Sequence, residues 1–365
     1  MEDIYKKYAL LLTNYCLNIS KGHKVFIRST YLAEPLLQEL QTEILKKGGI
    51  PVFDISFAEK SKIALTYSEQ DQLEYIDLNT IEGFTKFDAF LSIQAPFNLK
   101  ETKNVDNEKR NILSNATKEI MKIYSVRSTD GSMRRSLCLY PTNASAQEAG
   151  MSLKEYESFV YGACKLYEDD PIGAWKKVGL EQQKYVDRLN MAKMVHYKGP
   201  NIDIQFSVEG RTWINSDGKS NMPSGEVFSA PVENSVNGKV KFTLPSIYMG
   251  NEVHDVTLEV KNGEVVKWDA SQGKEFLDKI FQIPGAKYFG EVAVGTNYNI
   301  QQITKNILFD EKIGGTIHMA IGQSYQHCGG KNESSVHWDM ITDMKDGGEI
   351  LADGELIYKN GHFIL

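Results

Sequence analysis

The first part of the chain alternates short apolar runs with stretches of helical periodicity. Residues 33–47 carry apolar side chains at helical spacing and stop at Gly48 and Gly49, a glycine pair typical of a helix C-cap. The strand-like runs are rich in β-branched and aromatic residues and lie at 24–29, 51–57, 87–96 and, after a helical start, 119–127. Strands that alternate with helices in this way form a parallel sheet covered by the helices. The pattern therefore predicts an α/β fold with a mostly parallel sheet.

The pattern changes after about residue 195. Short runs of alternating polar and apolar residues follow one another closely, and 256–268 has the pattern of a β-hairpin. Asn262 and Gly263 at its centre favour a type I′ turn, which requires positive φ angles. Helical signal is limited to 273–281 and a few turns. The pattern after residue 195 therefore predicts an α+β fold with a mixed or antiparallel, barrel-like sheet.

A helical region at 140–194 joins the two parts. Ser152 and Glu155 form a capping box at the start of one of its helices. We expect an N-terminal α/β domain at 1–190 and a C-terminal domain at 191–365.

Composition limits the classes of function. The net charge of −7 argues against a nucleic-acid partner, because phosphate binding needs a basic surface. No run approaches the ~20 apolar residues that span a bilayer, and the N-terminal segment lacks the features of a signal peptide. The four cysteines are scattered without a CxxC pair, which fits a reducing compartment. We expect a cytoplasmic protein with neither a membrane nor a nucleic-acid partner.

Nucleotide-binding motifs are missing from the sequence. There is no G-x-G-x-x-G after the first strand and no P-loop motif. An oxidoreductase built on the N-terminal domain is therefore unsupported.

Residues that can bind metal gather near the C-terminus. His318, His327 and His337 fall within twenty residues, and His337 and Asp339 are two positions apart on a predicted strand, so they share one face. Imidazole nitrogens and carboxylate oxygens suit divalent metals such as zinc and cobalt. A single histidine in a strand is more often a hydrogen-bonded structural residue, and the H-x-D pair makes the two interpretations about equally weighted.

Two glutamates stand in unusual surroundings. Glu226 and Glu291 each lie in a Gly-Glu-Val sequence that opens an apolar strand. A buried carboxylate needs a partner, and a metal ion is one partner that satisfies it. The alternative for each is a glutamate in a turn at the start of a strand.

Four segments together resemble the signature blocks of the aminopeptidase T / aminopeptidase S family of metallo-aminopeptidases, the thermophilic-type metalloproteases. They are MPSGEVFSAPVENSVNG, FGEVAVGTN, LFDEKIGGTIHMAIGQSY and NESSVHWDMI, in family order between Met222 and Ile341. Residues 141–164 match the connecting region of the family more loosely. The resemblance covers most of the chain.

The resemblance implies a metal-dependent aminopeptidase whose C-terminal domain at 191–365 is the metal-binding catalytic domain. It would hold two divalent metal ions per subunit, which could be Zn, Co, Mn or Mg. The resemblance also implies a homodimer that acts on peptides with a free N-terminus. The implied ligands are Glu226, Glu291, His318, Tyr325, His337 and Asp339. Two metals need a bridging carboxylate, for which Glu291 is our choice. The oxygen of Tyr325 could be a ligand, or it could donate a hydrogen bond to the bound water or to the transition-state oxyanion.

The proton from the attacking water needs a carboxylate outside the ligand set. Glu311, just before the strand of His318, is our candidate, and Asp310 beside it is the alternative. Glu311 could equally be a solvated turn residue next to Lys312.

Two other functions remain open at this point. One is a different dinuclear hydrolase, such as an amidohydrolase or dipeptidase, with the same ligands. The other is a non-catalytic metal-binding protein with the same fold, for which a lost ligand would be the mark, and no ligand is lost.

Overall fold

The computed structural model describes residues 2–365, and the chain forms two compact units. The first runs to Ala174 and includes Gly218–Pro223; the second consists of Trp175–Asp217 and Ser224–Leu365. We expected the division after residue 190. The second unit begins earlier because helix α9 (Pro171–Asn190) contributes Val186 and Leu189 to the core of that unit.

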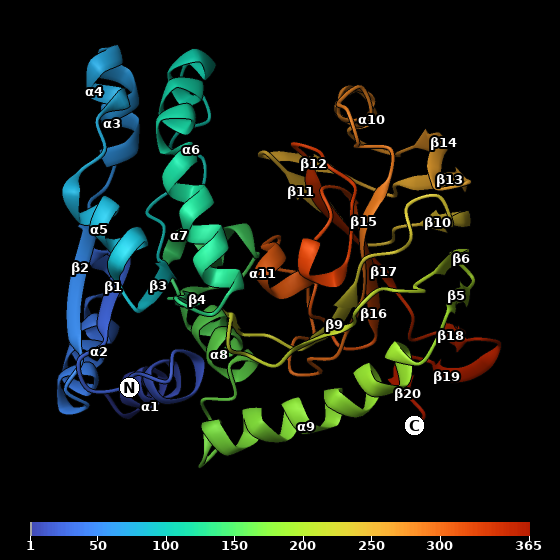
Figure 1. Ribbon diagram of the computed structural model, residues 1–365, viewed down its shortest axis with the longest axis horizontal. Helices are drawn as coiled ribbons and strands as arrows, with labels where there is room; N and C mark the ends of the chain where they lie inside the picture. Colours follow the sequence, from blue (N-terminus) through green and yellow to red (C-terminus); the bar gives the residue numbers. More distant parts are fainter. Residues whose placement is uncertain (1) are drawn as a thin grey trace. The chain divides into compact units, whose positions relative to one another are not determined.

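The first unit contains a five-stranded sheet in the order β2-β1-β3-β4-β8, and all of its pairings are parallel. This confirms the predicted α/β fold with a parallel sheet. The helices and strands follow in chain order (Figure 1): α1 (Glu2–Leu10), a π-helical segment (Leu11–Cys16), β1 (Lys24–Thr30), a 3-10 turn (Tyr31–Ala33), α2 (Glu34–Lys46), β2 (Ile50–Ser56), α3 (Lys60–Tyr67), α4 (Gln70–Glu74), α5 (Leu78–Lys86), β3 (Ala89–Gln94), α6 (Asn107–Thr129), β4 (Arg134–Leu139), α7 (Asn143–Glu148), α8 (Leu153–Ala163) and β8 (Asn221–Met222).

One strand of the first unit lies later than expected. Residues 119–127 do not pass from a helix into a strand, since α6 continues to Thr129 and the strand begins at Arg134. A turn through Asp130 and Gly131, where Gly131 has a φ of 78°, separates the two elements. The capping box of Ser152 and Glu155 at α8 is present as predicted.

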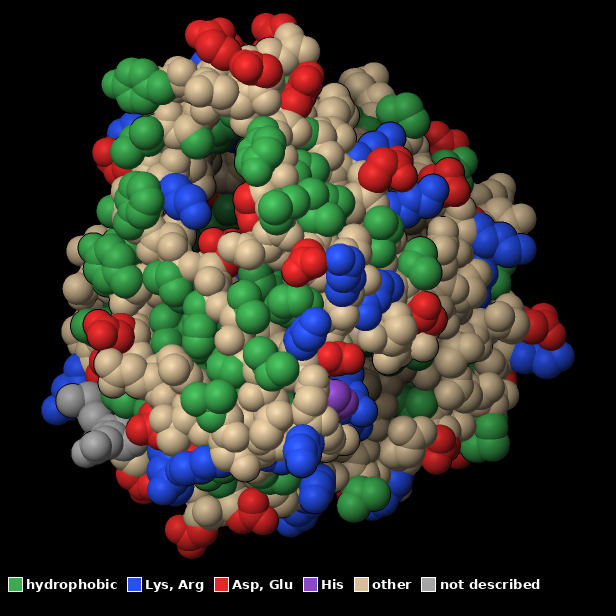
Figure 2. All heavy atoms as spheres, turned by 60° about the vertical axis from the view of Figure 1, so that its left-hand side comes forward, with side chains coloured by type: hydrophobic (Ala, Val, Ile, Leu, Met, Phe, Trp, Pro, Cys, Tyr) green, Lys and Arg blue, Asp and Glu red, His purple; other side chains and the backbone are tan. Residues whose placement is uncertain are grey.

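The helices α3 to α6 of the first unit leave many apolar side chains exposed. A cavity of ≈ 390 Å³ lies among them, and Arg28, Phe84 and Arg110 are part of its lining. Figure 2 looks onto the side of the molecule that carries α3 to α5 and shows hydrophobic side chains gathered around a hollow. The exposed apolar residues of these helices are Ile63, Tyr67, Leu78, Leu113, Met121, Ile123 and Val126.

The second unit is built from two larger antiparallel sheets and a small two-stranded sheet. One has the order β14-β13-β10-β6-β5-β18-β19-β20 and the other β17-β16-β15-β9-β7. Besides α9, its elements are β5 (Met194–Gly199), β6 (Ile202–Ser207), β7 (Ile214–Ser216), β9 (Glu226–Ser229), β10 (Asn237–Lys241), β11 (Ser246–Tyr248), β12 (Asn251–Val253), β13 (Thr257–Lys261), β14 (Glu264–Asp269), α10 (Lys274–Ile280), β15 (Phe289–Gly295), α11 (Ile307–Asp310), β16 (Thr316–Gly322), a 3-10 turn (Gln326–Cys328), β17 (His337–Asp343), β18 (Glu349–Ala352), β19 (Glu355–Lys359) and β20 (His362–Phe363).

The prediction of an antiparallel sheet in this unit is confirmed, and the prediction of a barrel-like closure is wrong. Among residues 2–365 no pairing joins the edge strands of either larger sheet, so both sheets are open. The predicted hairpin is formed by β13 and β14, and both turn residues have positive φ, 50° at Asn262 and 85° at Gly263. Across residues 2–365, no helix combines the length and apolar character needed to cross a bilayer.

Candidate metal centre

Four adjacent strands of the five-stranded sheet carry five of the six predicted metal ligands on one face. Glu226 begins β9, Glu291 lies on β15, His318 on β16, and both His337 and Asp339 on β17. These strands are neighbours in the order β17-β16-β15-β9. Paired residues of antiparallel strands project to the same side of a sheet, so the register decides whether the five side chains meet.

The register places small residues between the candidate ligands. Ala320 of β16 pairs with Glu291 on one side and with Asp339 on the other. His318 pairs with Ala293, and Glu226 pairs with Gly295. Because alanine and glycine project little or no side chain from this face, the longer acidic and imidazole groups have room to converge above it.

The glycine before each of the two glutamates has a steric reason. A Cβ at Gly290 would lie 2.3 Å from the backbone oxygen of Gln323, and the pairing of β15 with β16 shifts register at this residue, as in a β-bulge. A Cβ at Gly225, which has a φ of +113°, would lie 2.7 Å from the Cβ of Asn297. The Gly-Glu-Val sequences are therefore positions where the backbone packs closely and the next side chain turns into the site.

Two groups of metal-capable side chains result. The Glu226 group consists of Glu226, Glu311 and His318, and the Glu291 group of Glu291, His337 and Asp339. Within each group the potential ligand atoms lie within 4.8 Å of one another.

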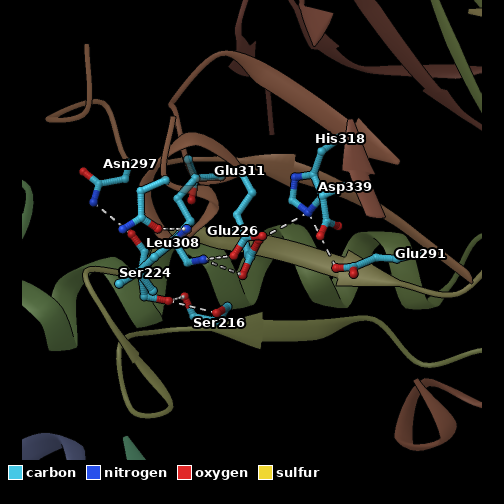
Figure 3. A network of polar contacts seen from close by, with 12 residues as sticks. Ser216, Ser224, Glu226, Glu291, Asn297, Leu308, Glu311, His318 and Asp339 are labelled. Atoms are coloured by element: carbon cyan, nitrogen blue, oxygen red, sulfur yellow. Dashed lines mark hydrogen bonds and ion pairs between the residues drawn. The ribbon is translucent and has the colours of Figure 1, made fainter. Parts of the chain in front are cut away.

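The two groups adjoin through Glu291 and His318. Oε1 of Glu291 lies 3.6 Å from Nε2 of His318, and its Oε2 lies 3.2 Å from Nε2 of His337. Nε2 of His318 lies 3.4 Å from Oε2 of Glu226. Figure 3 shows the carboxylates of Glu226 and Glu311 close together on one side of His318, with Glu291 and Asp339 on the other. Glu291 thus offers one oxygen to each group.

The site suits divalent ions because several of its buried nitrogen and oxygen atoms have no hydrogen-bond partner. Both ring nitrogens of His318 and Oδ1 of Asp339 are buried without a hydrogen-bond partner anywhere in residues 2–365. Nδ1 of His337 lies 2.8 Å from the backbone oxygen of Gln323, to which it can donate. That hydrogen bond leaves Nε2, which faces Glu291, with its lone pair. A histidine held in this way by a backbone carbonyl is the usual arrangement at metal sites.

The carboxylates of the site also stabilise positive charge. Burial opposes protonation of His318, yet the carboxylates of Glu291, Glu226 and Asp339 raise its pKa to about 9. Burial also opposes protonation of His337, yet Asp339 and Glu291 raise its pKa to about 12. Buried carboxylates that stabilise protonated imidazoles this strongly are also a favourable environment for metal cations.

Glu311 and Asp310 have different surroundings. The side chain of Glu311 is only 15% exposed and contacts the ammonium of Lys312, so it is not a solvated turn residue. Its carboxylate lies with that of Glu226 and the imidazole of His318 in the Glu226 group. Asp310 accepts hydrogen bonds from the backbone nitrogen and hydroxyl of Thr304 at 2.8 and 2.9 Å, and it belongs to neither group.

Tyr325 borders the Glu291 group. Its ring centroid lies 5.0 Å from that of His337 and 5.5 Å from that of Phe228, which follows Glu226 by two residues on β9. Burial, together with the carboxylates of Glu291 and Asp339, raises the pKa of its phenol well above the usual value. In the absence of a metal ion the hydroxyl therefore keeps its proton and can donate it in a hydrogen bond.

Two residues near the site were missed by the sequence interpretation. Lys312 has a fully buried side chain whose Nζ lies 3.6 Å from Oε1 of Glu226. Asp310 and Glu311 precede it in the sequence, which is the setting of a solvated lysine, so the sequence carried no signal for its burial. Gln182 of α9 donates to the backbone oxygen of Glu226 at 3.2 Å and to Oδ1 of Asn215 at 2.7 Å. Nothing in the helical sequence around Gln182 distinguishes it from Gln183.

Carboxylates and imidazoles in two adjoining groups are the ligand set of a metal-dependent hydrolase. A model of the family described as thermophilic metalloprotease (M29) matches residues 1–363. Aminopeptidase 2 of Geobacillus stearothermophilus is 30% identical over 99% of this chain and 98% of its own. Aminopeptidase AmpS of Bacillus subtilis is 32% identical over 56% of this chain and 58% of its own. Wild-type AmpT from Thermus thermophilus has the same fold, with a TM-score of 0.83 at 22% identity over 100% of this chain and 99% of that one.

The chain therefore belongs to the thermophilic metalloprotease (M29) family. The family resemblance drawn from the four sequence blocks is confirmed. The prediction of an enzyme of the metallo-aminopeptidase class, a hydrolase of peptide bonds, is confirmed with it.

Proposed function

We propose that this protein removes N-terminal residues from peptides at a dinuclear metal site formed by the Glu226 group and the Glu291 group. The observation that carries the proposal is the position of Glu291, whose two oxygens face His318 and His337 at 3.6 and 3.2 Å. A carboxylate in this position could be shared by two divalent ions and would reduce the repulsion between them. Glu226 and His318 would hold one ion, and His337 and Asp339 the other.

Divalent ions, when bound, supply Lewis acidity and lower the pKa of a coordinated water toward neutrality. The residues of the chain have three further tasks, which are to orient the peptide, to stabilise the negative charge that develops on the scissile carbonyl, and to move a proton from the water to the leaving amine.

Tyr325 is suited to stabilise the oxyanion, and Glu311 is suited to move the proton. The protonated phenol of Tyr325, beside the Glu291 group, would donate a hydrogen bond to the developing oxyanion. The same oxygen could instead bind a metal ion, as the family resemblance implies. Glu311 would accept the proton from the water and return it to the leaving amine, because its carboxylate lies within the Glu226 group. In that position Glu311 could also serve as a ligand.

With neutral imidazoles and ionised carboxylates, the four carboxylates of the two groups and the single ammonium of Lys312 carry a negative charge that two divalent ions would offset. The preference for a free N-terminus would therefore come from an open coordination position that accepts the neutral α-amine of the peptide. Zn, Co, Mn and Mg are the candidate ions. The family resemblance supports a homodimer. The cysteines support a location in the cytoplasm, because all four are buried and none forms a disulfide within residues 2–365.

The test is hydrolysis of an amino-acid p-nitroanilide after removal of metal. Dialysis against a chelator should abolish hydrolysis, and Zn, Co, Mn or Mg should restore it. The N-acetylated form of the same substrate should resist hydrolysis throughout. Equal cleavage of the blocked substrate would indicate an amidohydrolase of another kind, and no hydrolysis with any of the four metals would refute the proposal.

A further inference from the structure

Lys312 is a cation built into one of the two metal-binding groups. It follows Glu311 directly after α11, and its side chain is fully buried. The ammonium contacts a carboxylate oxygen of Glu311 and lies 3.6 Å from Oε1 of Glu226. Both partners are acidic members of the Glu226 group, so a single lysine engages both carboxylates of that group.

The Glu291 group has no comparable cation. Among the ion pairs of residues 2–365, Glu291 and Asp339 pair with His318 and His337 and with no lysine or arginine. With neutral imidazoles, the two carboxylates of the Glu291 group carry a charge of −2. When both of its carboxylates are ionised, the Glu226 group and Lys312 together carry −1.

This difference acts on a divalent ion in two ways. One positive charge a few ångströms away repels the ion strongly in a buried site, where screening is weak. The ammonium also uses an oxygen of Glu311 that a metal would otherwise bind. Both effects act most strongly on the Glu226 group, whose two carboxylates the ammonium contacts, whereas its charge acts on Asp339 of the Glu291 group only at longer range.

We infer that Lys312 makes the two metal sites unequal, so that the first divalent ion binds tightly at the Glu291 group and the second binds weakly at the Glu226 group in competition with the lysine ammonium. The inference rests on the proposed dinuclear site. The filling of the second site, and with it the active fraction of the enzyme, would then follow the free metal concentration.

Titration of the metal-free, full-length protein with Co²⁺ tests this directly. Calorimetry and the visible absorption of bound Co²⁺ should resolve two steps, and the second should be at least about tenfold weaker. Crystals grown with one equivalent of Co²⁺ should show anomalous scattering at Glu291, His337 and Asp339. This arm needs no substitution, so it holds even if variants of Lys312 fail to fold.

The variant Lys312→Met removes the ammonium and keeps much of the side-chain volume. It should tighten the second step by at least about tenfold and leave the first within about twofold. The control Lys274→Met removes a lysine that pairs with Asp278 on α10, 47% exposed, and should change neither step.

The possible outcomes separate this inference from the proposed function. Two equal sites, a first ion in the Glu226 group, or a second step that Lys312→Met does not tighten would overturn the role of Lys312 while leaving a dinuclear enzyme intact. A second ion that binds only to the variant would support the role of Lys312 and would contradict the dinuclear site proposed for the wild type. Failure of Co²⁺ to bind either group would refute both.

Discussion

Nε2 of His337 lies 3.6 Å from Oδ1 of Asp339, two residues further along β17. The alternation of side chains along a strand brings the two groups to one face, and the buried Oδ1 has no hydrogen-bond donor among residues 2–365. An acceptor of this kind beside an imidazole is a strong candidate for metal binding.

The substitution Asp339→Asn tests this pair. It removes one negative charge from the Glu291 group, and a neutral amide oxygen is a weaker ligand. We expect kcat/KM to fall by at least about 100-fold, together with a loss of bound metal. Metal content by atomic emission and p-nitroanilide kinetics would measure both. The control Asp343→Asn, at the exposed end of the same strand, should behave like the wild type.

Gln182 is expected to position the backbone at Glu226. The substitution Gln182→Ala removes the hydrogen bonds to the oxygens of Glu226 and Asn215, so Glu226 is held less firmly. Metal affinity should fall by about 10–100-fold, as is typical for residues that orient a ligand. Gln183→Ala, one position along α9, is the matched control, and equal losses in the two variants would contradict a specific role.

The substitution Tyr325→Phe separates the two roles of the phenol. If the hydroxyl donates to the oxyanion, kcat should fall by about 10²–10³-fold with unchanged metal content. Loss of one metal ion from the variant would show that Tyr325 is a ligand. Unchanged kinetics and unchanged metal content would exclude both roles.

Gly290 should be intolerant of a side chain. In Gly290→Ala the Cβ would meet the backbone oxygen of Gln323 at 2.3 Å, so β15 must shift next to Glu291. We expect a loss of about 1–3 kcal/mol in the free energy of unfolding, measured by urea denaturation of the metal-free protein. Gly162→Ala in α8, where the nearest atoms lie at 4.0 Å, should not be destabilised. A stable Gly290→Ala variant would show that the strand can relax.

Local patterns in the sequence were sufficient for much of the fold. The parallel sheet, the capping box of Ser152 and the Asn262-Gly263 turn each depend on neighbouring residues, and each is present. The position of β4 was wrong because α6 has no buried residues, so its periodicity does not mark where the helix ends. Sheet closure and the start of the second unit depend on packing between distant segments, which periodicity does not contain.

The sequence indicated the individual residues of the candidate site but not how they come together. The spacing of His337 and Asp339 and the Gly-Glu-Val sequences pointed to single ligands, and the family resemblance grouped them. The pairing of Glu291 with Ala320 and of His318 with Ala293, which brings them to one face, is a matter of strand register. Lys312 was missed because a lysine next to a glutamate is usually solvated, and only the fold shows that its ammonium is buried.

The most direct test of the central claim is a crystal structure of the protein saturated with Co²⁺ or Zn²⁺, with the ions located by anomalous scattering. We predict two ions, one at each group, with ligand atoms of Glu226, Glu291, His318, His337 and Asp339 within about 2.0–2.6 Å of an ion and Glu291 shared between them. A saturated structure in which Glu226 or Asp339 contacts no ion would contradict the account.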